Sequence, residues 1–360
     1  MTDLAPLLQA PFWTQGERVL TCTARHDETF DGDTVTATTF TFQTLPQASR
    51  FYYLPGQFVL LAVDIDGHLH HRAYSLSSTP TRPHQLAVTI KRVAGGVVSN
   101  YLLDCLQPGM TLRSTPPQGQ FHLPARLPAD LVLLSAGSGI TPMLSISQAL
   151  QDLGMPCRIH FVHSARHAGD VIALPALQAL AAQPNFRLTL LLETPSNQLP
   201  CLPGRLDSER LAAVTAGLTD YQFLLCGPAG YLDAVHQLLQ APRYAGVPLA
   251  EEQFTASTTT TGETASANES AASGFALRVP AFGTDSQISA DETLLDALER
   301  EGLPIIGACR AGVCGSCKCK VEQGEVESSS QLALTPDQIA DGYVLACSSK
   351  ARSDVQVSLG

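Results

Sequence analysis

Four cysteines constrain this 360-residue chain more than any other feature. Cys309, Cys314 and Cys317 lie within nine residues, and Cys347 follows thirty residues later. The spacing C-x4-C-x2-C…C is the ligand pattern of plant-type [2Fe-2S] clusters. Glycines in and beside the loop permit the positive φ angles that a chain needs to wrap a small inorganic core. We therefore predict that these four thiolates bind a [2Fe-2S] cluster.

Two other uses of these cysteines fit the pattern less well. Structural zinc sites usually show two short cysteine pairs, whereas this pattern is a triplet and a distant single residue. The segment Cys314-Gly-Ser-Cys317 alone could be a redox dithiol. Cys319 is an extra thiol that we expect to pack in the following strand rather than to bind metal.

Composition indicates a cytoplasmic protein that binds neither nucleic acid nor a membrane. The net charge of −11 provides no general basic surface for either partner. The N-terminus lacks a basic and apolar signal sequence, and no run of about 18 apolar residues occurs. The remaining cysteines are scattered singly, which favours a reducing compartment. Residues 275–360 are acidic and could attract a basic partner, although a solvated surface without a partner is the commoner meaning of such charge.

The sharpest boundary is the segment 255–274, in which ten of 20 residues are Ser or Thr. It has no large apolar residue, so we predict a flexible linker that spans on the order of 25 Å. Residues 15–125 show short alternating strands broken by Gly and Pro, which predicts an antiparallel β-barrel. Residues 126–254 alternate strand and helix, which predicts a parallel α/β sheet. Residues 275–360 read as an α+β domain.

Two motifs fall in the predicted barrel. Arg72, Tyr74 and Ser75 offer a guanidinium for phosphate, a ring that can stack on a flat cofactor and a hydroxyl, or else form an ordinary strand. The segment from Gly95 to Ser99 opens an apolar helix and predicts an anion site at its N-terminus, with a hairpin turn as the alternative. Three nearby histidines at 68, 70 and 71 invite a metal site, but no third ligand shares one face of the strand.

Two further motifs follow strands of the predicted parallel sheet. Ser135 to Pro142 reads as a strand end, a glycine turn and a helix with proline at its first position, where exposed amides can hold a pyrophosphate. Cys226-Gly227-Pro228 again ends a strand and opens a helix, at the sheet edge where ligands bind. The thiol of Cys226 could instead be structural.

The order of these motifs resembles the ferredoxin-reductase-like flavoproteins that carry a C-terminal plant-type ferredoxin domain. The resemblance covers nearly all of residues 15–360. Ala308–Cys317 and Gly342–Cys347 look most like the NADH oxidoreductase of hybrid-cluster protein. Phe161–Arg166 and Val88–Asn100 look equally like reductases of Rieske oxygenases, including those that demethylate betaines. The implied architecture is a β-barrel for FAD, an α/β domain for NAD(P) and a β-grasp ferredoxin domain.

The resemblance also implies a role for each motif in the flavin site. Arg72 would hold the flavin pyrophosphate, Tyr74 would stack on the isoalloxazine, and Ser75 would bond near its reactive nitrogen. Ser75 and Cys226 would be the catalytic residues. The residues implied to bind the flavin are Arg72, Ala73, Tyr74, Ser75, Thr89, Ile90, Lys91, Gly96, Val97, Val98, Ser99 and Phe254.

The nicotinamide dinucleotide would lie along the parallel sheet. The glycine turn would bind its pyrophosphate, Cys226 would place the nicotinamide, and Ser164 and Arg166 would read the ribose without deciding between NADH and NADPH. The residues implied are Gly137, Ser138, Gly139, Thr141, Pro142, Ser164, Arg166, Cys226, Gly227 and Pro228. Phe254 ends a Glu-x-Phe motif that would pack against the flavin, and Glu251 and Glu252 both remain candidates for its acid.

These expectations describe a protein that accepts two electrons together and passes them on one at a time. A nicotinamide gives hydride, a [2Fe-2S] cluster accepts single electrons, and a flavin must stand between them. The linker would let the cluster domain reach first the flavin and then an external metalloprotein. We predict hybrid-cluster protein as that acceptor, with a Rieske oxygenase or demethylase as the alternative. A redox sensor that responds to NADH is the alternative of another class.

Overall fold

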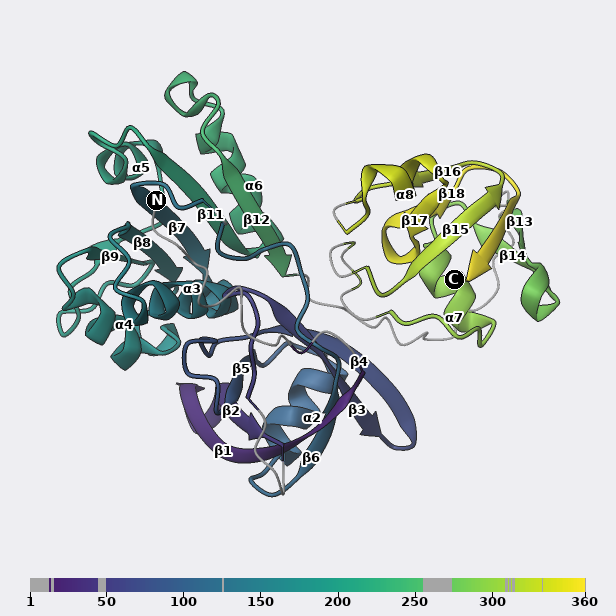
Figure 1. Ribbon diagram of the computed structural model, residues 1–360, viewed down its shortest axis with the longest axis horizontal. Helices are drawn as coiled ribbons and strands as arrows, with labels where there is room; N and C mark the ends of the chain where they lie inside the picture. Colours follow the sequence, from purple (N-terminus) through teal and green to yellow (C-terminus); the bar gives the residue numbers. More distant parts are fainter. Residues whose placement is uncertain are drawn as a thin grey trace. The chain divides into compact units, whose positions relative to one another are not determined.

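The computed structural model describes residues 13, 16–44, 50–124, 126–254, 274–307, 310, 312, 315–331 and 333–359. It divides into two compact units (Figure 1). The larger unit holds an antiparallel sheet and a parallel sheet, and the smaller unit holds the C-terminal sheets. The predicted linker 255–274 lies outside the described residues except for Gly274. In the part of the chain that is described, no helix is long and apolar enough to cross a membrane.

The first sheet is the predicted antiparallel barrel. Its six strands run in the order β4-β3-β6-β1-β2-β5, and a bridge between Leu76 and Val88 links the end of β4 to β5. Alternation in β2 turns Phe40 and Phe42 into the core. The helix α2 (Val97–Cys105) packs its apolar residues on the same core. The strands are β1 (Arg18–Asp31), β2 (Thr34–Gln43), β3 (Phe58–Ile65), β4 (His68–Ser75), β5 (Leu86–Lys91) and β6 (Thr111–Ser114).

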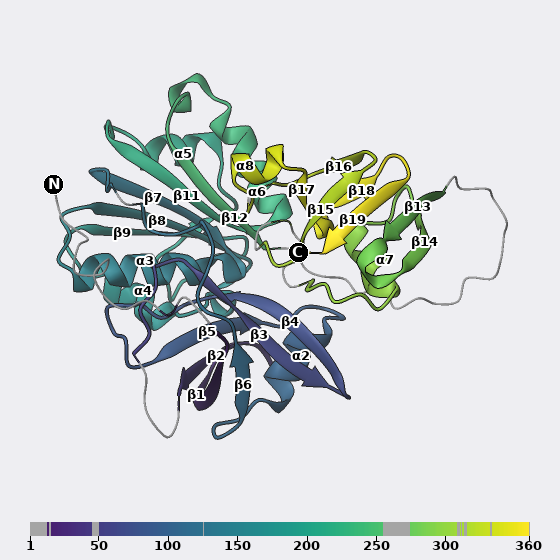
Figure 2. The ribbon, with the colours of Figure 1, turned by 45° about the vertical axis from the view of Figure 1, so that its right-hand side comes forward.

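The second sheet is parallel, with the strand order β10-β9-β8-β7-β11-β12. The helices α3 and α4 cover one face and α5 and α6 the other (Figure 2). The chain leaves β7 toward β8 and later returns beside it as β11, which creates the crevice at the carboxyl ends of the strands. The elements are β7 (Asp130–Ala136), α3 (Ile140–Asp152), β8 (Arg158–Ala165), α4 (Leu174–Ala181), β9 (Phe186–Leu192), β10 (Leu202–Pro203), α5 (Ser208–Val214), β11 (Tyr221–Pro228), α6 (Ala229–Leu239) and β12 (Leu249–Phe254).

The start of α3 differs from the prediction. Pro142 was expected at the first helical position, but a 3-10 turn at Gly137–Gly139 runs into the helix, and α3 already begins at Ile140. Pro142 is therefore the third residue of the helix. The first four N–H groups of a helix have no partner within it, so the missing N–H of proline still costs nothing there.

The smaller unit is a mixed sheet packed on one helix, as the predicted α+β class requires. Leu294 and Leu298 of α7 are buried against the sheet residues Leu277 and Val357. The main sheet has the order β14-β13-β19-β15-β17, and β16 pairs with β18. The elements are β13 (Gly274–Val279), β14 (Thr284–Ser289), α7 (Leu294–Arg300), β15 (Lys318–Gln323), β16 (Val326–Ser328), α8 (Pro336–Ala340), β17 (Tyr343–Leu345), β18 (Ser349–Ala351) and β19 (Val355–Leu359).

Candidate functional site

The barrel meets the carboxyl edge of the parallel sheet at a buried polar contact. Ser75, the last residue of β4, donates from its Oγ to Glu252 Oε2 at 3.0 Å. Glu252 lies on β12 directly opposite Cys226 of β11. Burial and the nearby Glu252 carboxylate raise the pKa of Cys226, so its thiol stays protonated at neutral pH. The two predicted catalytic residues, Ser75 and Cys226, are thus brought together around one carboxylate.

The geometry separates the two candidate acids of the Glu-x-Phe motif. Strand alternation sends their side chains to opposite faces of β12. Glu251 Oε2 lies 2.7 Å from His236 Nε2 of α6, whereas Glu252 is buried beside Ser75. Phe254 shares the side of Glu252 and packs, partly buried, against the core of the parallel sheet. Glu252 is therefore the acid that faces the barrel.

The other flavin-site candidates of the barrel lie on β4 and β5. Tyr74 packs half-buried against the barrel core, and Arg72 donates from Nη1 to the carbonyl of His71 at 2.8 Å. The hydroxyl of Thr89 lies 2.7 Å from that of Thr39 and donates to Ser77 Oγ. The side chain of Ile90 is buried in the core, so only its backbone can line a cofactor. Ala73 lies between Arg72 and Tyr74 on β4.

The side chain of Lys91 extends from the barrel to the glycine turn of the parallel sheet. It ends β5 in the barrel, yet its Nζ lies 3.6 Å from where a Cβ on Gly137 would stand. Burial lowers the pKa of Lys91, and the carboxylate of Asp170 partly offsets this. The amine therefore lies at the glycine turn of the parallel sheet, where a pyrophosphate is expected.

The first glycine turn leads into α2. Gly95 has φ +69, and a Cβ on Gly96 would stand 2.7 Å from Ser99 Oγ and 2.9 Å from Val93 Cβ. Ser99 Oγ in turn accepts the N–H of Val93 at 3.3 Å. Gly96 is the N-cap of α2, and the next residues, Val97 and Val98, begin the helix. The amides at this end are suited to an anion such as a flavin phosphate.

The second glycine turn packs directly on β11. Gly137 has φ +54, and a Cβ on Gly139 would stand only 2.2 Å from the carbonyl oxygen of Cys226. Thr141 Oγ1 donates to the carbonyl of Ser138 at 3.0 Å and closes the turn. Gly139 of the turn and Cys226 are 87 positions apart in sequence, yet their two motifs form one wall of the crevice.

Tyr231 and His163 are site residues that the sequence did not single out. A Cβ on Gly227 would stand 3.0 Å from the Tyr231 ring, and burial raises the pKa of this tyrosine. Ser135 Oγ lies 2.8 Å from His163 Nδ1, and both side chains are fully buried at the ends of β7 and β8. Burial, with the charge of Lys91, lowers the pKa of His163 to about 3, so this ring is neutral. Only the parallel pairing of the strands brings these groups together.

The proposed ribose-reading residues differ in their surroundings. Arg166 donates from Nε to Asp170 Oδ2 at 2.9 Å, and His167 Nε2 lies 3.3 Å from the same oxygen. Asp170 is buried at 6% exposure, whereas the Arg166 side chain is 68% exposed. Ser164 lies near Tyr231, and Pro228 is the last residue of β11. The positive charge of Arg166 is therefore partly neutralised by a local partner.

The described part of the cysteine loop fits a thiolate-bound cluster. Cys309 and Cys314 lie outside the described residues, whereas Cys317 and Cys347 are described and buried. Gly312 N–H donates to Cys347 Sγ at 3.2 Å, and Cys347 N–H points to Cys317 Sγ at 3.4 Å. Backbone N–H groups directed at sulfur stabilise thiolate ligands. Within the described ranges, no three side chains gather as metal ligands, either here or at the barrel histidines.

Two neighbours of the loop have structural roles. Arg310, at φ +53, donates to Asp296 Oδ1 at 3.1 Å and also pairs with Glu299, which ties the loop to α7. Cys319 is fully buried in the core of the smaller unit, as expected of a residue that packs in the strand. Burial raises its pKa to about 12, with the Cys317 charge adding to this.

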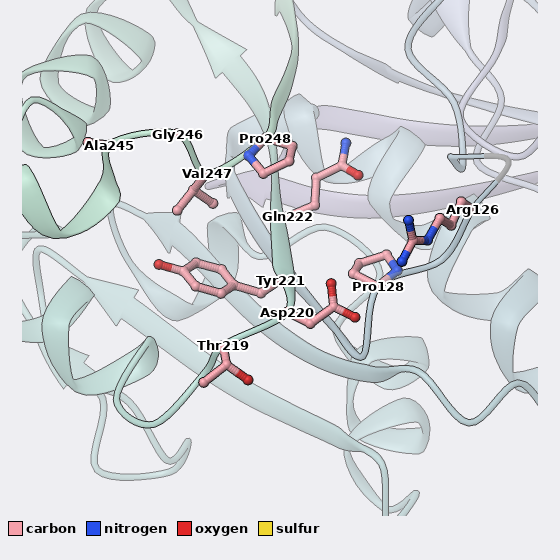
Figure 3. Close-up of a pocket in the computed structure, with 10 residues that line it drawn as sticks. All are labelled: Arg126, Pro128, Thr219, Asp220, Tyr221, Gln222, Ala245, Gly246, Val247 and Pro248. Atoms are coloured by element: carbon pink, nitrogen blue, oxygen red, sulfur yellow. The ribbon is translucent and has the colours of Figure 1, made fainter.

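A pocket of about 450 Å³ lies elsewhere on the parallel sheet (Figure 3). Asp220, Tyr221 and Gln222 line it at the beginning of β11, and Val247 and Pro248 line it just before β12. This is the amino edge of the sheet, whereas parallel sheets bind ligands at the carboxyl edge. The pocket contains none of the predicted site residues.

Family models assign this arrangement to a class of enzyme. An oxidoreductase FAD-binding domain matches residues 32–123, an oxidoreductase NAD-binding domain matches 133–237, and a 2Fe-2S iron-sulfur cluster binding domain matches 282–352. The chain therefore belongs to the ferredoxin-reductase-like flavoproteins with a C-terminal [2Fe-2S] domain. It is an NAD(P)H-dependent oxidoreductase with FAD and [2Fe-2S] as cofactors, which confirms the predicted class and cofactors.

Full-length relatives are reductase subunits. The chain is 35% identical to the glycine betaine monooxygenase reductase subunit of Pseudomonas aeruginosa, with 96% of both chains covered. It is 31% identical to the stachydrine N-demethylase reductase subunit Stc4 of Rhizobium meliloti, with 97% and 98% covered. Phthalate dioxygenase reductase has the same fold, with a TM-score of 0.67 at 20% identity over 96% of this chain and 98% of that chain.

Proposed function

We propose that this chain is the reductase component of a Rieske-type oxygenase or demethylase. The observation that carries the proposal is the likeness, over 96% and 97% of the chain, to reductase subunits of a monooxygenase and of an N-demethylase. The electron-accepting partner would then be an oxygenase. The expectation of hybrid-cluster protein has no support among these relatives, so it becomes an outcome of the test. The cytoplasmic location stays a prediction.

The barrel side of the crevice would hold the flavin. Arg72 and the amides at Gly96 to Ser99 would hold its phosphates, and Tyr74 would stack on its ring. Ser75 would donate a hydrogen bond to the ring once a cofactor competes with Glu252 for its hydroxyl. When bound, the flavin converts the hydride chemistry of the nicotinamide into single electrons for the [2Fe-2S] cluster.

The parallel sheet would place the second nucleotide. Lys91 and the turn at Gly137–Gly139 form a positive, amide-rich surface that suits a pyrophosphate. Cys226 contributes a neutral, buried thiol to the wall of the crevice, where an uncharged group leaves room for a nicotinamide ring without repelling it. Glu252 holds Ser75 in place by accepting the hydrogen bond of its hydroxyl. The four cysteines, including the two outside the described residues, would bind the cluster.

Anaerobic stopped-flow absorbance tests the acceptor. The holoenzyme is mixed with NADH, or with NADPH, in the presence of either a betaine-demethylating Rieske oxygenase or hybrid-cluster protein. We expect fast reduction of the Rieske centre and slow reduction of the hybrid cluster. Fast reduction of the hybrid cluster alone would overturn the proposal, and slow reduction of both would favour the redox sensor. Reduction of a small dye measures the flavin reaction separately.

A further inference from the structure

The cysteine loop is tied to the segment around Cys347 by a closed ring of hydrogen bonds. Gly312 N–H donates to Cys347 Sγ at 3.2 Å. Ser330 Oγ donates to the carbonyl of Gly312 at 2.7 Å, and Ser348 Oγ donates to the carbonyl of Ser330 at 2.9 Å. Cys347 and Ser348 are adjacent in sequence, so the peptide bond between them closes the ring.

Packing holds three of these residues, Gly312, Ser330 and Ser348, at close range. Gly312 has φ +70, and a Cβ there would stand 2.6 Å from Ser330 Cβ and 2.9 Å from Ser348 Cβ. Ser348 is 9% exposed, and the carbonyl of Leu345, 3.2 Å from its hydroxyl, is a second and more distant acceptor for the same proton. A serine side chain has a single χ angle that places its hydroxyl, so little freedom remains at these contacts. Gly312 and Ser348 are buried and Ser330 is half-buried, so the ring lies against packed residues of the smaller unit.

The ring determines how firmly one N–H group points at a ligand sulfur. Hydrogen bonds to the sulfurs of iron–sulfur clusters stabilise the more negative reduced state and so raise the reduction potential. Groups outside the ligand shell that orient the ligands also affect how tightly a metal is retained. If Ser330 releases the carbonyl of Gly312, that residue can turn, and its N–H can leave Cys347.

We propose that Ser330 and Ser348 are positioning residues of the [2Fe-2S] centre: they hold Gly312 N–H on Cys347 Sγ, raise the reduction potential and slow the loss of the cluster. The spacing of the ligand cysteines contains no sign of either serine. The inference rests on the [2Fe-2S] domain of the chain and not on the identity of the electron acceptor, so its test does not need an acceptor.

The experiment compares Ser330→Ala and Ser348→Ala in the full-length holoenzyme with the matched variant Ser328→Ala. Ser328 lies in the same segment, but its hydroxyl bonds to Ser349 Oγ at 2.7 Å and does not touch Gly312. Redox titration followed by electron paramagnetic resonance measures the potential, and loss of visible absorbance in a chelator measures retention of the cluster. For both ring variants we expect a more negative potential and bleaching about tenfold faster than in the wild type.

The double variant tests whether the contacts form one ring. Opening a ring at a second point adds little, so we expect the double variant to shift the potential no more than the larger single shift. Circular dichroism and thermal melting identify any variant that loses the fold. If Ser348→Ala or the double variant loses the fold, the potential and the bleaching rate of Ser330→Ala decide whether the proposal stands. Potentials and bleaching rates equal to those of Ser328→Ala would overturn the proposal, as would shifts that add fully in the double variant.

Discussion

The two glycine turns of the larger unit look alike in sequence but are constrained in different ways. Each contains one glycine with positive φ, Gly95 before α2 and Gly137 before α3. Each also contains one glycine with negative φ that has no room for a Cβ, Gly96 and Gly139. For Gly96 the obstructing atoms belong to Val93 and Ser99, three residues away on either side.

For Gly139 the obstructing atoms belong to another strand. A Cβ there would stand 2.2 Å from the carbonyl oxygen of Cys226 and 2.7 Å from the N of Gly227. At Gly96 the Ser99 hydroxyl can rotate away and Val93 lies in the loop before α2, whereas the backbone of a central strand cannot move without its neighbours. The glycine turn in the barrel is therefore constrained by neighbours in its own loop, whereas the turn in the parallel sheet is constrained by a contact with β11. We expect Gly139 to tolerate substitution less than Gly96.

The substitution Gly139→Ala tests the tertiary contact and should have the largest effect. Its φ suits any residue, so the cost is steric, and the start of α3 must move away from β11. A displacement of about 1 Å at a reacting site can cost roughly 100-fold in rate, so we expect at least that loss in NADH-driven flavin reduction. Anaerobic stopped-flow absorbance at the flavin band measures it.

Gly230→Ala is the matched control, because Gly230 lies in the first turn of α6 with nothing within 4 Å of a Cβ and without a positive φ. It should keep the rate within about twofold. A Gly139→Ala enzyme that reduces its flavin as fast as this control would show that the close approach to Cys226 has no functional weight.

The contact between Ser75 and Glu252 joins residues 177 positions apart, and we expect the next largest effect there. Glu252→Gln removes the charge that orients Ser75, and a hydrogen bond to a charged group contributes about 1.5 to 3 kcal/mol, which corresponds to a loss of roughly tenfold to 100-fold. Glu251→Gln alters the adjacent acid, which faces His236 instead, and should leave flavin reduction within about twofold. Equal loss in both variants would contradict the assignment of Glu252 as the acid that faces the barrel.

Sequence patterns predict the elements better than the contacts between them. The predicted antiparallel sheet and the predicted parallel sheet are both present, because apolar periodicity and the flanking glycines and prolines are local signals. The glycine turns and the cysteine spacing are local as well. Pairings such as Ser135 with His163, or the reach of Lys91 to Gly137, depend on strand order, which no single segment contains. The choice of electron acceptor depends on the surface that binds the partner protein. Motifs shared by a whole family carry no information about that surface.

The local turn in the barrel should be easier to perturb without loss of function. In Gly96→Ala the nearest atom is Ser99 Oγ, which can rotate, although it then gives up the N–H of Val93. An overpacked contact of this kind costs about 1 to 2 kcal/mol, so FAD affinity should fall about tenfold. Quenching of flavin fluorescence on titration of the apoprotein measures this. If Gly96→Ala lowers FAD affinity by as large a factor as Gly139→Ala lowers the rate of flavin reduction, the two turns are equally constrained and the comparison fails.

The smallest effect should arise from a local ion pair beside the second turn. Asp170 accepts from Arg166 four residues earlier, and its carboxylate partly neutralises the guanidinium. Asp170→Asn would leave Arg166 more positive and better able to attract the 2′-phosphate of NADPH. Pairs with an exposed partner contribute about 1 kcal/mol, so the ratio of kcat/KM for NADPH to that for NADH should rise roughly fivefold.

Steady-state dye reduction with each nucleotide measures that ratio. Glu193→Gln is the control, because it removes the partner of the exposed Arg205 just after β9 and should leave the ratio unchanged. The effect should also weaken at high salt, since the Arg166 side chain is exposed and its field is screened. A ratio that does not move in Asp170→Asn would mean that Arg166 does not face the ribose, and that the discrimination between the two nucleotides lies in residues beyond this local pair.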